Sequence, residues 1–225
     1  MTIRGLVLDF DGLIIDTERP VYEAWRWVFE QHGCEPLSID EWASCIGTPD
    51  AWDPVDKLAA RGVEVDAAVV EARRRIGRAV LDAEGARPGV VELLVAAREM
   101  ELPLAVASSS PTDWVVPLLE RLDIADWFGF VACFREGIRG KPHPDLYLEA
   151  CDAIGVTPSE AIAFEDSSHG VAAAKAAGMR CVAVPHTLTA GLDFSAADLV
   201  VDSLASVSLA ELVDQWSQPA RAEGA

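Results

Sequence analysis

The stretch GLVLDFDG, residues 5–12, decides the fold of this chain. Its first four residues form an apolar run, which is typical of a buried strand in a parallel sheet. Asp9 and Asp11 follow at once, one residue apart, at the carboxyl end of that strand. Two carboxylates this close raise each other's pKa unless a cation or a phosphate partner is present, so the pair indicates metal-assisted chemistry.

The strand pattern recurs in the second part of the chain. From Arg87 onward, short apolar runs alternate with amphipathic segments, as in a parallel sheet with crossover helices. With residues 3–8 as the first, the predicted strands are 104–107, 130–133, 161–164, 181–184 and 199–201. Helices are predicted over 90–100, 114–122, 144–154 and 170–177. Gly178 stands where the last of these should end.

Residues 17–85 contain no comparable strand and have helical spacing instead. Helices are predicted there over 22–32, 39–45, 55–61 and 67–81, separated by breaks at 33–36, 47–49 and 61–62. An insertion directly after the first strand is expected to cover the strand ends. We therefore predict a catalytic α/β core made of residues 1–16 and 86–225 and a helical cap domain made of residues 17–85, with a hinge at each crossing.

Composition limits the partners of this protein. Half of the 225 residues are apolar, so a packed core is feasible. The net charge of −19 and only 18 basic residues exclude nucleic acid and anionic membranes as partners. Because these basic residues are scattered, a divalent cation is expected to supply the positive centre that an anionic substrate needs.

The cysteines and the absence of an apolar leader predict the compartment. Five cysteines without a CxxC pair are typical of reduced thiols. The sequence starts without a secretory pattern, and no apolar run reaches membrane-spanning length. We expect a soluble cytoplasmic protein that is a monomer or a weak dimer.

Polar residues follow three more of the predicted strands. Ser108 and Ser109 come after 104–107, Lys141 lies in the loop after 130–133, and Glu165 and Asp166 come after 161–164. Ligands of open parallel sheets bind beyond the carboxyl ends of the strands, so these side chains are expected to meet Asp9 and Asp11 at one edge.

The order of these residues resembles the haloacid dehalogenase superfamily. DFDGLIIDT at 9–17 resembles its first signature, Ser108 its second, Lys141 within Gly-Lys-Pro its third, and Glu165-Asp166 its fourth. The resemblance covers residues 3–201, and the helical insertion is similar to that of the beta-phosphoglucomutase-like subgroup. It implies an α/β fold with a Rossmann-like parallel sheet core and an inserted all-helical cap domain.

The same resemblance implies a role for each site residue. Asp9 would attack phosphorus to form an aspartyl phosphate, and Asp11 would act as acid and then as base. Ser108, Ser109 and Lys141 would bind the phosphate. Mg²⁺ would be held by Asp9, the backbone carbonyl of Asp11, Glu165 and Asp166. The implied reaction is hydrolysis of a small phosphorylated metabolite, such as a sugar phosphate.

Simpler structural roles compete with these. An aspartate after a strand often serves as a turn residue, and Glu165 and Asp166 with the two serines that follow could only begin a helix. The joint order of four signatures favours catalysis. The four histidines lack metal-ligand spacing and are expected in turns or on the surface, with only His169 near the site. Three cap tryptophans are expected to be packing residues, namely Trp25, Trp42 and Trp52.

Other reaction types remain to be weighed. Dehalogenases lack the second aspartate, and phosphonate cleavage needs a cap lysine where this cap offers only Lys57. A phosphosugar mutase is the second candidate, although Val21 and Pro49 or Asp50 stand where mutases carry a histidine and an arginine. Three other arginines could hold a second phosphate instead, namely Arg19, Arg26 and Arg61. A phospho-acceptor signalling receiver carries its acidic residues in a different order along the chain. A catalytically silent binding protein would lack one of the required residues, and none is missing here. Substrate selectivity is expected at residues 45–49.

Overall fold

The computed structural model describes residues 2–43 and 53–217. The predicted selectivity segment 45–49, the mutase-related Pro49 and Asp50, and Trp52 lie outside the described residues. Within them, no helix combines the length and the apolar character that crossing a membrane requires.

Six parallel strands form one sheet in the order β3-β2-β1-β4-β5-β6. They are β1 (Gly5–Leu8), β2 (Leu104–Ser108), β3 (Phe130–Cys133), β4 (Ala161–Glu165), β5 (Arg180–Ala183) and β6 (Leu199–Val200). This is the strand order of a doubly wound, Rossmann-like sheet, as predicted. β1 lies between β2 and β4, so the residues that follow β1 emerge at the centre of the sheet edge.

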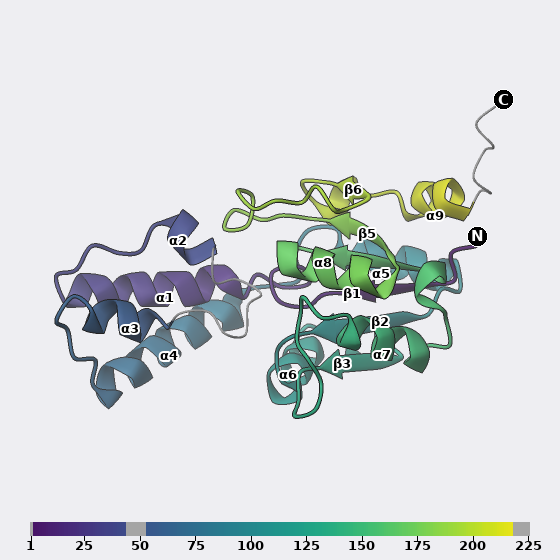
Figure 1. Ribbon diagram of the computed structural model, residues 1–225. Coiled ribbons are helices and arrows are strands. Elements are labelled where there is room, and N and C mark those ends of the chain that lie inside the picture. The colour runs from purple at the N-terminus through teal and green to yellow at the C-terminus, as the bar shows by residue number, and fades with distance from the viewer. Residues whose placement is uncertain (1, 44–52, 218–225) are drawn as a thin grey trace.

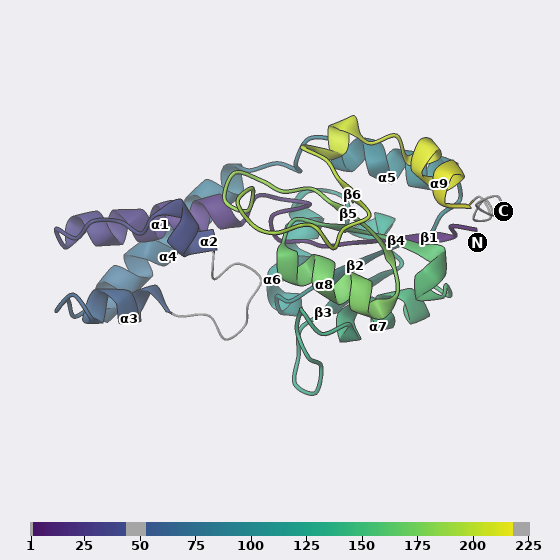
Figure 2. The same ribbon diagram turned by 45° about the horizontal axis from the view of Figure 1, so that its top comes forward.

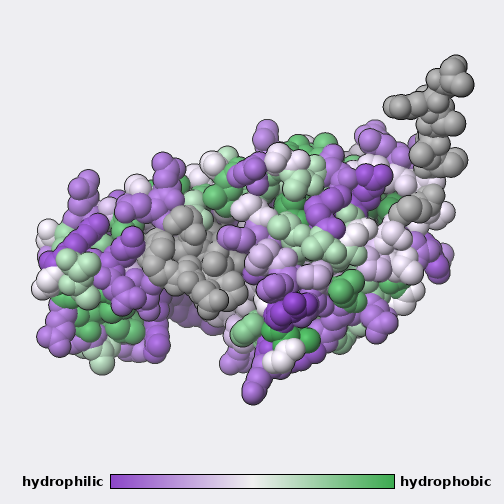
Figure 3. Space-filling view, viewed as in Figure 1, coloured by the Kyte–Doolittle hydropathy of each residue, from purple (hydrophilic) through white to green (hydrophobic). Residues whose placement is uncertain are grey.

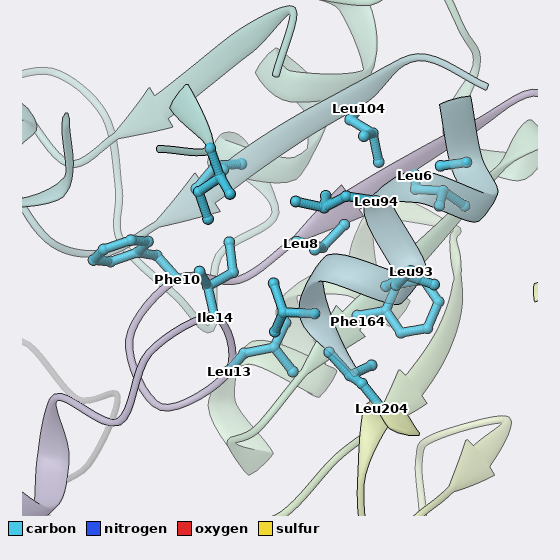
Figure 4. Close-up of a cluster of buried hydrophobic side chains, with 14 of the residues drawn as sticks. Leu6, Leu8, Phe10, Leu13, Ile14, Leu93, Leu94, Leu104, Phe164 and Leu204 are labelled. Carbon is cyan, nitrogen blue, oxygen red and sulfur yellow. The ribbon is translucent and has the colours of Figure 1, made fainter. Parts of the chain in front are cut away.

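Helices cover both faces of the sheet because its side chains alternate in direction. Leu6 and Leu8 belong to a buried cluster on one face, against α5 (Val90–Glu99), α6 (Thr112–Arg121) and α9 (Leu209–Ser217). Val7 belongs to a second cluster on the other face, against α7 (Asp145–Ala153) and α8 (Ser168–Ala177). Figure 4 shows Leu6 and Leu8 beside Leu93 and Leu94 of α5.

The loop after β1 is anchored in the same core. Phe10, Leu13 and Ile14 are fully buried, and Figure 4 shows them in the hydrophobic cluster. Gly12 has a φ of +79°, which glycine adopts without strain. These buried contacts fix the backbone on which Asp9 and Asp11 are carried.

The insertion after β1 forms a separate helical unit of α1 (Glu18–Gln31), α2 (Ile39–Ala43), α3 (Pro54–Ala59) and α4 (Ala67–Ala83). This unit lies beyond the carboxyl ends of the strands (Figures 1 and 2). Its own buried cluster contains Trp25 and Trp42, which confirms their predicted packing role, together with Phe29. Leu188, from the loop after β5, belongs to this cluster as well.

Three details differ from the sequence-based expectations. α1 begins at Glu18 rather than Tyr22, with Thr17 at its N-cap. α9 was not predicted, although Leu209 and Leu212 bury its apolar face. The expectation of scattered basic residues is wrong for α4, which carries Arg73, Arg74, Arg75 and Arg78.

The outer surface mixes residue types. On the face seen in Figure 3, hydrophilic residues are spread over both the helical unit and the sheet region. The buried apolar residues of the three clusters hold the elements in position.

Candidate active site

Three carboxylates meet where β1 and β4 end side by side. Leu8 pairs with Phe164, so Asp9 and Glu165 leave the sheet next to each other, and Asp166 follows directly. One ligand oxygen from each of these three residues lies within 4.8 Å of the others, and all three side chains are buried. The strand-end argument thus correctly brings these three residues together.

Lys141 is inserted between two of these carboxylates. Its Nζ contacts Asp9 Oδ1 and lies 2.5 Å from Glu165 Oε1, and its side chain is only 3% exposed. The backbone N–H of Lys141 donates to Ser109 Oγ at 3.2 Å, which ties the β3 loop to the loop after β2. Ser109 therefore positions Lys141 in this structure.

Glu165 is held by donors on every side. The Tyr147 hydroxyl donates to its Oε1 at 2.7 Å, and the backbone N–H groups of Asp166 and Ser167 donate to Oε2 at 3.0 and 3.2 Å. Gly170 makes the room, because a Cβ built there would lie 1.8 Å from Oε1. Ser167 also caps α8 by accepting from the Gly170 N–H, which confirms the predicted cap. The Glu165 carboxylate is therefore fixed in place.

The Asp11 carboxylate is not part of this group of three and is bound by donors from β2, the loop after it and α6. Its Oδ2 accepts from Ser108 Oγ at 3.1 Å and from Ser110 Oγ at 2.7 Å, and its Oδ1 accepts from Trp114 Nε1 at 2.8 Å. Ser110 and Trp114 were not singled out in the sequence. The run of three serines after β2 could have pointed to Ser110, whereas nothing local marks Trp114.

His186 is a further site residue that sequence reasoning missed. Its Nε2 lies 3.0 Å from Asp166 Oδ2 with the side chain 7% exposed, so the expected surface role is wrong. The alternative turn role is confirmed, since the His186 carbonyl accepts from the Thr189 and Ala190 N–H groups. Nδ1 accepts from the Leu188 N–H, which assigns the ring proton of the neutral form to Nε2. His186 follows β5 at the same sheet edge, so the strand-end rule would have found it. His169, the histidine expected near the site, lies in the first turn of α8.

The electrostatics of the site follow from burial. Desolvation raises the pKa of Asp9 well above its ordinary value, and Glu165 raises it further while Lys141 lowers it. Desolvation and Glu165 likewise raise the pKa of Asp166. Burial alone would lower the pKa of Lys141, but Asp9 and Glu165 raise it above its ordinary value. One ammonium thus faces three buried carboxylates, and this imbalance favours the uptake of a cation.

The residues fit a divalent metal ion. Carboxylate oxygens are the ligands of hard cations. Asp166 Oδ2 is buried and accepts no hydrogen bond from residues 2–43 and 53–217, because His186 Nε2, although 3.0 Å away, is not placed to donate to it. Gly12 keeps the space beside it open, since a Cβ there would lie 2.0 Å from this oxygen. Three buried carboxylates that could hold a cation and a fixed ammonium therefore converge at one sheet edge.

Comparison with known proteins agrees with this geometry. Residues 6–184 match the family model of haloacid dehalogenase-like hydrolases. The Bacillus subtilis (strain 168) protein named "Putative phosphatase YhcW" is 40% identical, over 94% of this chain and 97% of its own length. "Phosphorylated carbohydrates phosphatase" of Thermotoga maritima is 30% identical, over 84% and 88%. "Beta-phosphoglucomutase" of Bacillus subtilis (strain 168) is 28% identical, over 96% of each chain.

A solved structure shares the fold as well. The crystal structure of CbbY from Rhodobacter sphaeroides in complex with phosphate aligns with a TM-score of 0.71 and 28% identity. The alignment covers 93% of this chain and 99% of that one. The chain therefore belongs to the haloacid dehalogenase-like hydrolase family and is an enzyme of its phosphatase type.

Proposed function

We propose that this enzyme is a Mg²⁺-dependent phosphatase that hydrolyses a small phosphomonoester, such as a sugar phosphate, through an aspartyl phosphate. The observation that carries the proposal is the buried group of Asp9, Glu165 and Asp166 around Lys141. Relatives named as phosphatases, one of them for phosphorylated carbohydrates, support the substrate class.

The reaction divides into two displacements at phosphorus. In the first, an Asp9 oxygen attacks phosphorus, the bond to the leaving oxygen breaks, and Asp11 gives that oxygen a proton. In the second, Asp11 takes a proton from water, whose oxygen attacks the aspartyl phosphate and releases inorganic phosphate with Asp9 restored. Asp11 thus carries one proton out and receives one back in each turnover.

The remaining groups of the site act on the negative charge of the phosphoryl group while it is transferred. Lys141 holds the Asp9 and Glu165 carboxylates and offers its one remaining N–H donor to a phosphoryl oxygen. Ser108 gives its only hydroxyl proton to Asp11 in this structure, so binding the phosphate requires this donor to turn to the substrate. Bound Mg²⁺, held by Asp9, Glu165, Asp166 and the Asp11 carbonyl, would stabilise negative charge on the phosphoryl oxygens.

The helical unit is the proposed cap domain. Residues 17–85 would close over the core formed by residues 1–16 and 86–225 and exclude water from the aspartyl phosphate. α1 begins and α4 ends on the side of the sheet where β1 ends (Figure 1), which suits hinges at these two crossings. The cytoplasmic location and the monomeric or weakly dimeric state stay predictions.

The proposal is tested by phosphate release from a panel of sugar phosphates. Wild type should release phosphate only with Mg²⁺, and Asp9→Asn should lose roughly a thousandfold or more, because it removes the nucleophile. Asp113→Asn is the matched control, since Asp113 is an exposed acid in the first turn of α6. Full activity in Asp9→Asn would refute the nucleophile assignment. Isomerisation of a sugar phosphate without phosphate release would favour the mutase.

The metal assignment is tested without turnover. Calorimetric titration with Mg²⁺ should show one site in wild type, and Asp166→Asn should weaken it by about tenfold or more because a charged ligand is lost. Asp113→Asn should bind as wild type does. Unchanged affinity in Asp166→Asn would remove Asp166 from the ligand set.

A further inference from the structure

A cavity of about 360 Å³ lies between α1, α4 and α6. Its apolar wall includes Pro20, Leu81 and Trp114, and its basic wall is formed by Arg73, Arg74 and Arg78. The volume is within the range of sites for small ligands. A lining with one apolar and one basic wall suits a small organic molecule that carries an anionic group.

The arginines of the helical unit differ in their pairing. Within the cavity, Arg78 donates to Asp82 at 2.8 Å and Arg74 lies 4.0 Å from Glu71, both in exposed ion pairs. Arg19 pairs with Asp16 and Glu84, and Arg26 pairs with Glu23 and Glu30, so both are committed to carboxylates. Arg61 donates to the Glu35 carbonyl and lies over the Phe29 ring. The arginines that the sequence suggested for a second anionic group are thus engaged elsewhere in this structure.

Arg73 differs from them. It lies over the Trp25 ring, 5.0 Å from the ring centroid, and its buried Nε has no hydrogen-bond partner among the residues that the structure describes. Burial and the neighbouring Arg74 both lower its pKa, so an anion placed beside it would be stabilised by two guanidinium groups. In a chain of net charge −19, four of the 18 basic residues lie within positions 73–78.

Trp114 joins this cavity to the reacting groups. Its Nε1 donates to Asp11 Oδ1 at 2.8 Å, while the side chain also lines the cavity. Trp114 therefore contacts both the Asp11 carboxylate and the cavity. A leaving group that extended past Asp11 along Trp114 would approach the arginines of α4.

We propose that this cavity, lined by Arg73, Arg74 and Trp114, binds a second anionic group, a carboxylate or a phosphate, at the far end of the substrate's leaving group. The assignment rests on the proposed phosphatase reaction and narrows its substrate class to phosphomonoesters with two anionic ends. Because this far group does not change charge during the reaction, its binding acts mainly on KM rather than on kcat.

A matched pair of substrates tests this. 6-Phosphogluconate and glucitol 6-phosphate differ only in a carboxylate against a hydroxymethyl group. Wild type should favour 6-phosphogluconate in kcat/KM by roughly tenfold to a hundredfold, which is the range of one or two charge-assisted hydrogen bonds. Arg73→Gln should bring the ratio close to one through KM, and Arg73→Lys should keep part of the preference.

The control is Arg75→Gln, since Arg75 is an exposed neighbour on α4 that does not line the cavity. It should leave the substrate ratio unchanged, and thermal unfolding should show that all variants are folded. The assignment would be overturned if Arg73→Gln lowered kcat/KM equally for both substrates. It would also be overturned if Arg75→Gln changed the substrate ratio in the same way, or if wild type showed no preference. Free gluconate should inhibit the hydrolysis of glucitol 6-phosphate competitively if it binds in this cavity. Inhibition that depends on Arg73 but is not competitive would also overturn the assignment.

Binding separates this inference from the proposed reaction. In the Asp9→Asn background, calorimetry should show that 6-phosphogluconate binds more tightly than glucitol 6-phosphate, and that Arg73→Gln removes the difference. If wild type releases no phosphate but this difference is present, the reaction is wrong and the cavity assignment stands. If wild type is active and the difference is absent, the cavity assignment is wrong.

Discussion

The sheet and the helical unit differ in how much of each is buried. Every residue of β1, β2 and β4 is buried, whereas the 17-residue α4 buries only Leu81. A closely packed interior tolerates little displacement, so side chains that follow these strands are held in fixed positions. A helix with one buried residue can change its other positions at small cost. The proposed chemistry thus lies on the rigid region and the proposed substrate recognition on the adaptable one.

Charge is distributed differently in the two regions as well. Lys141 and its carboxylate partners are buried together, so removing one partner leaves an uncompensated charge in the interior. The ion pairs of the helical unit are exposed, as in Arg26 with Glu23 and Arg78 with Asp82. Such exposed pairs contribute little to stability. The helical unit is therefore held mainly by its aromatic cluster.

The largest effect on stability is expected from removing a buried aromatic ring from either region. Phe164→Ala should lower the free energy of unfolding of the whole protein by about 3–5 kcal/mol, because it removes a fully buried ring from the sheet core. Phe29→Ala removes an equally buried ring from the separate cluster of the helical unit. Denaturant unfolding of Phe29→Ala should therefore show an early loss of the helical unit before the sheet melts. A single shared transition in Phe29→Ala would show that the two regions unfold as one.

Two glycines within helices give a sharper test of the same contrast. Gly170→Ala should destabilise by about 2–4 kcal/mol, since its Cβ would displace Glu165 from its hydrogen bonds. Gly77→Ala in α4 should instead stabilise by about 0.5–1 kcal/mol, because its Cβ has ordinary contacts at 3.6 Å and alanine favours the helix. Thermal unfolding measures both changes. Destabilisation of similar size in the two variants would contradict the contrast.

A smaller effect is expected where the two regions join. Arg121 of α6 donates to the backbone carbonyls of Leu81, Asp82 and Glu84 at the end of α4. Arg121→Ala should cost about 1–2 kcal/mol, because these carbonyls lose their charged donor. Limited proteolysis near residue 85 should speed up. Arg4→Ala, which removes only an exposed pair with Glu160, is the control and should change little.

The smallest effect concerns pH. Burial, followed by Asp11 and Asp166, raises the pKa of Glu18 from 4.5 to about 8. The unfolded chain loses this proton near pH 4.5 and the folded chain only near pH 8, so folding stability falls as pH rises through this window. Measured in a chelator, Glu18→Gln should be more stable than wild type by on the order of 1 kcal/mol at pH 8, since the carboxyl is partly exposed. The gain should vanish near pH 4; an equal gain at pH 4 and pH 8 would exclude titration of Glu18 as its source.

Much of the sheet and part of the site could be predicted from the sequence. The apolar runs located the strands because a fully buried strand has no polar face, and the ends of those strands located Asp9, Lys141 and Glu165. The short helix α9 was missed although Leu209 and Leu212 recur at helical spacing. Its place against the core is set by tertiary packing.

The remaining site residues depend on contacts that no local pattern encodes. Tyr147 and Trp114 reach the carboxylates from helices whose placement is set by the whole core. The run of arginines in α4 is visible in the sequence, but its position over a cavity is not. His186 shows the opposite case, because it follows a predicted strand and was judged by metal-ligand spacing alone.

The loop after β5 joins both regions within two residues. His186 faces Asp166, and Leu188 is buried among the aromatic residues of the helical unit. Two residues of extended chain span at most about 7 Å. The loop is thus a short connection between the two regions. If the helical unit moves away from the carboxylates by more than this distance, either Leu188 leaves its buried position or the His186 imidazole moves away from Asp166.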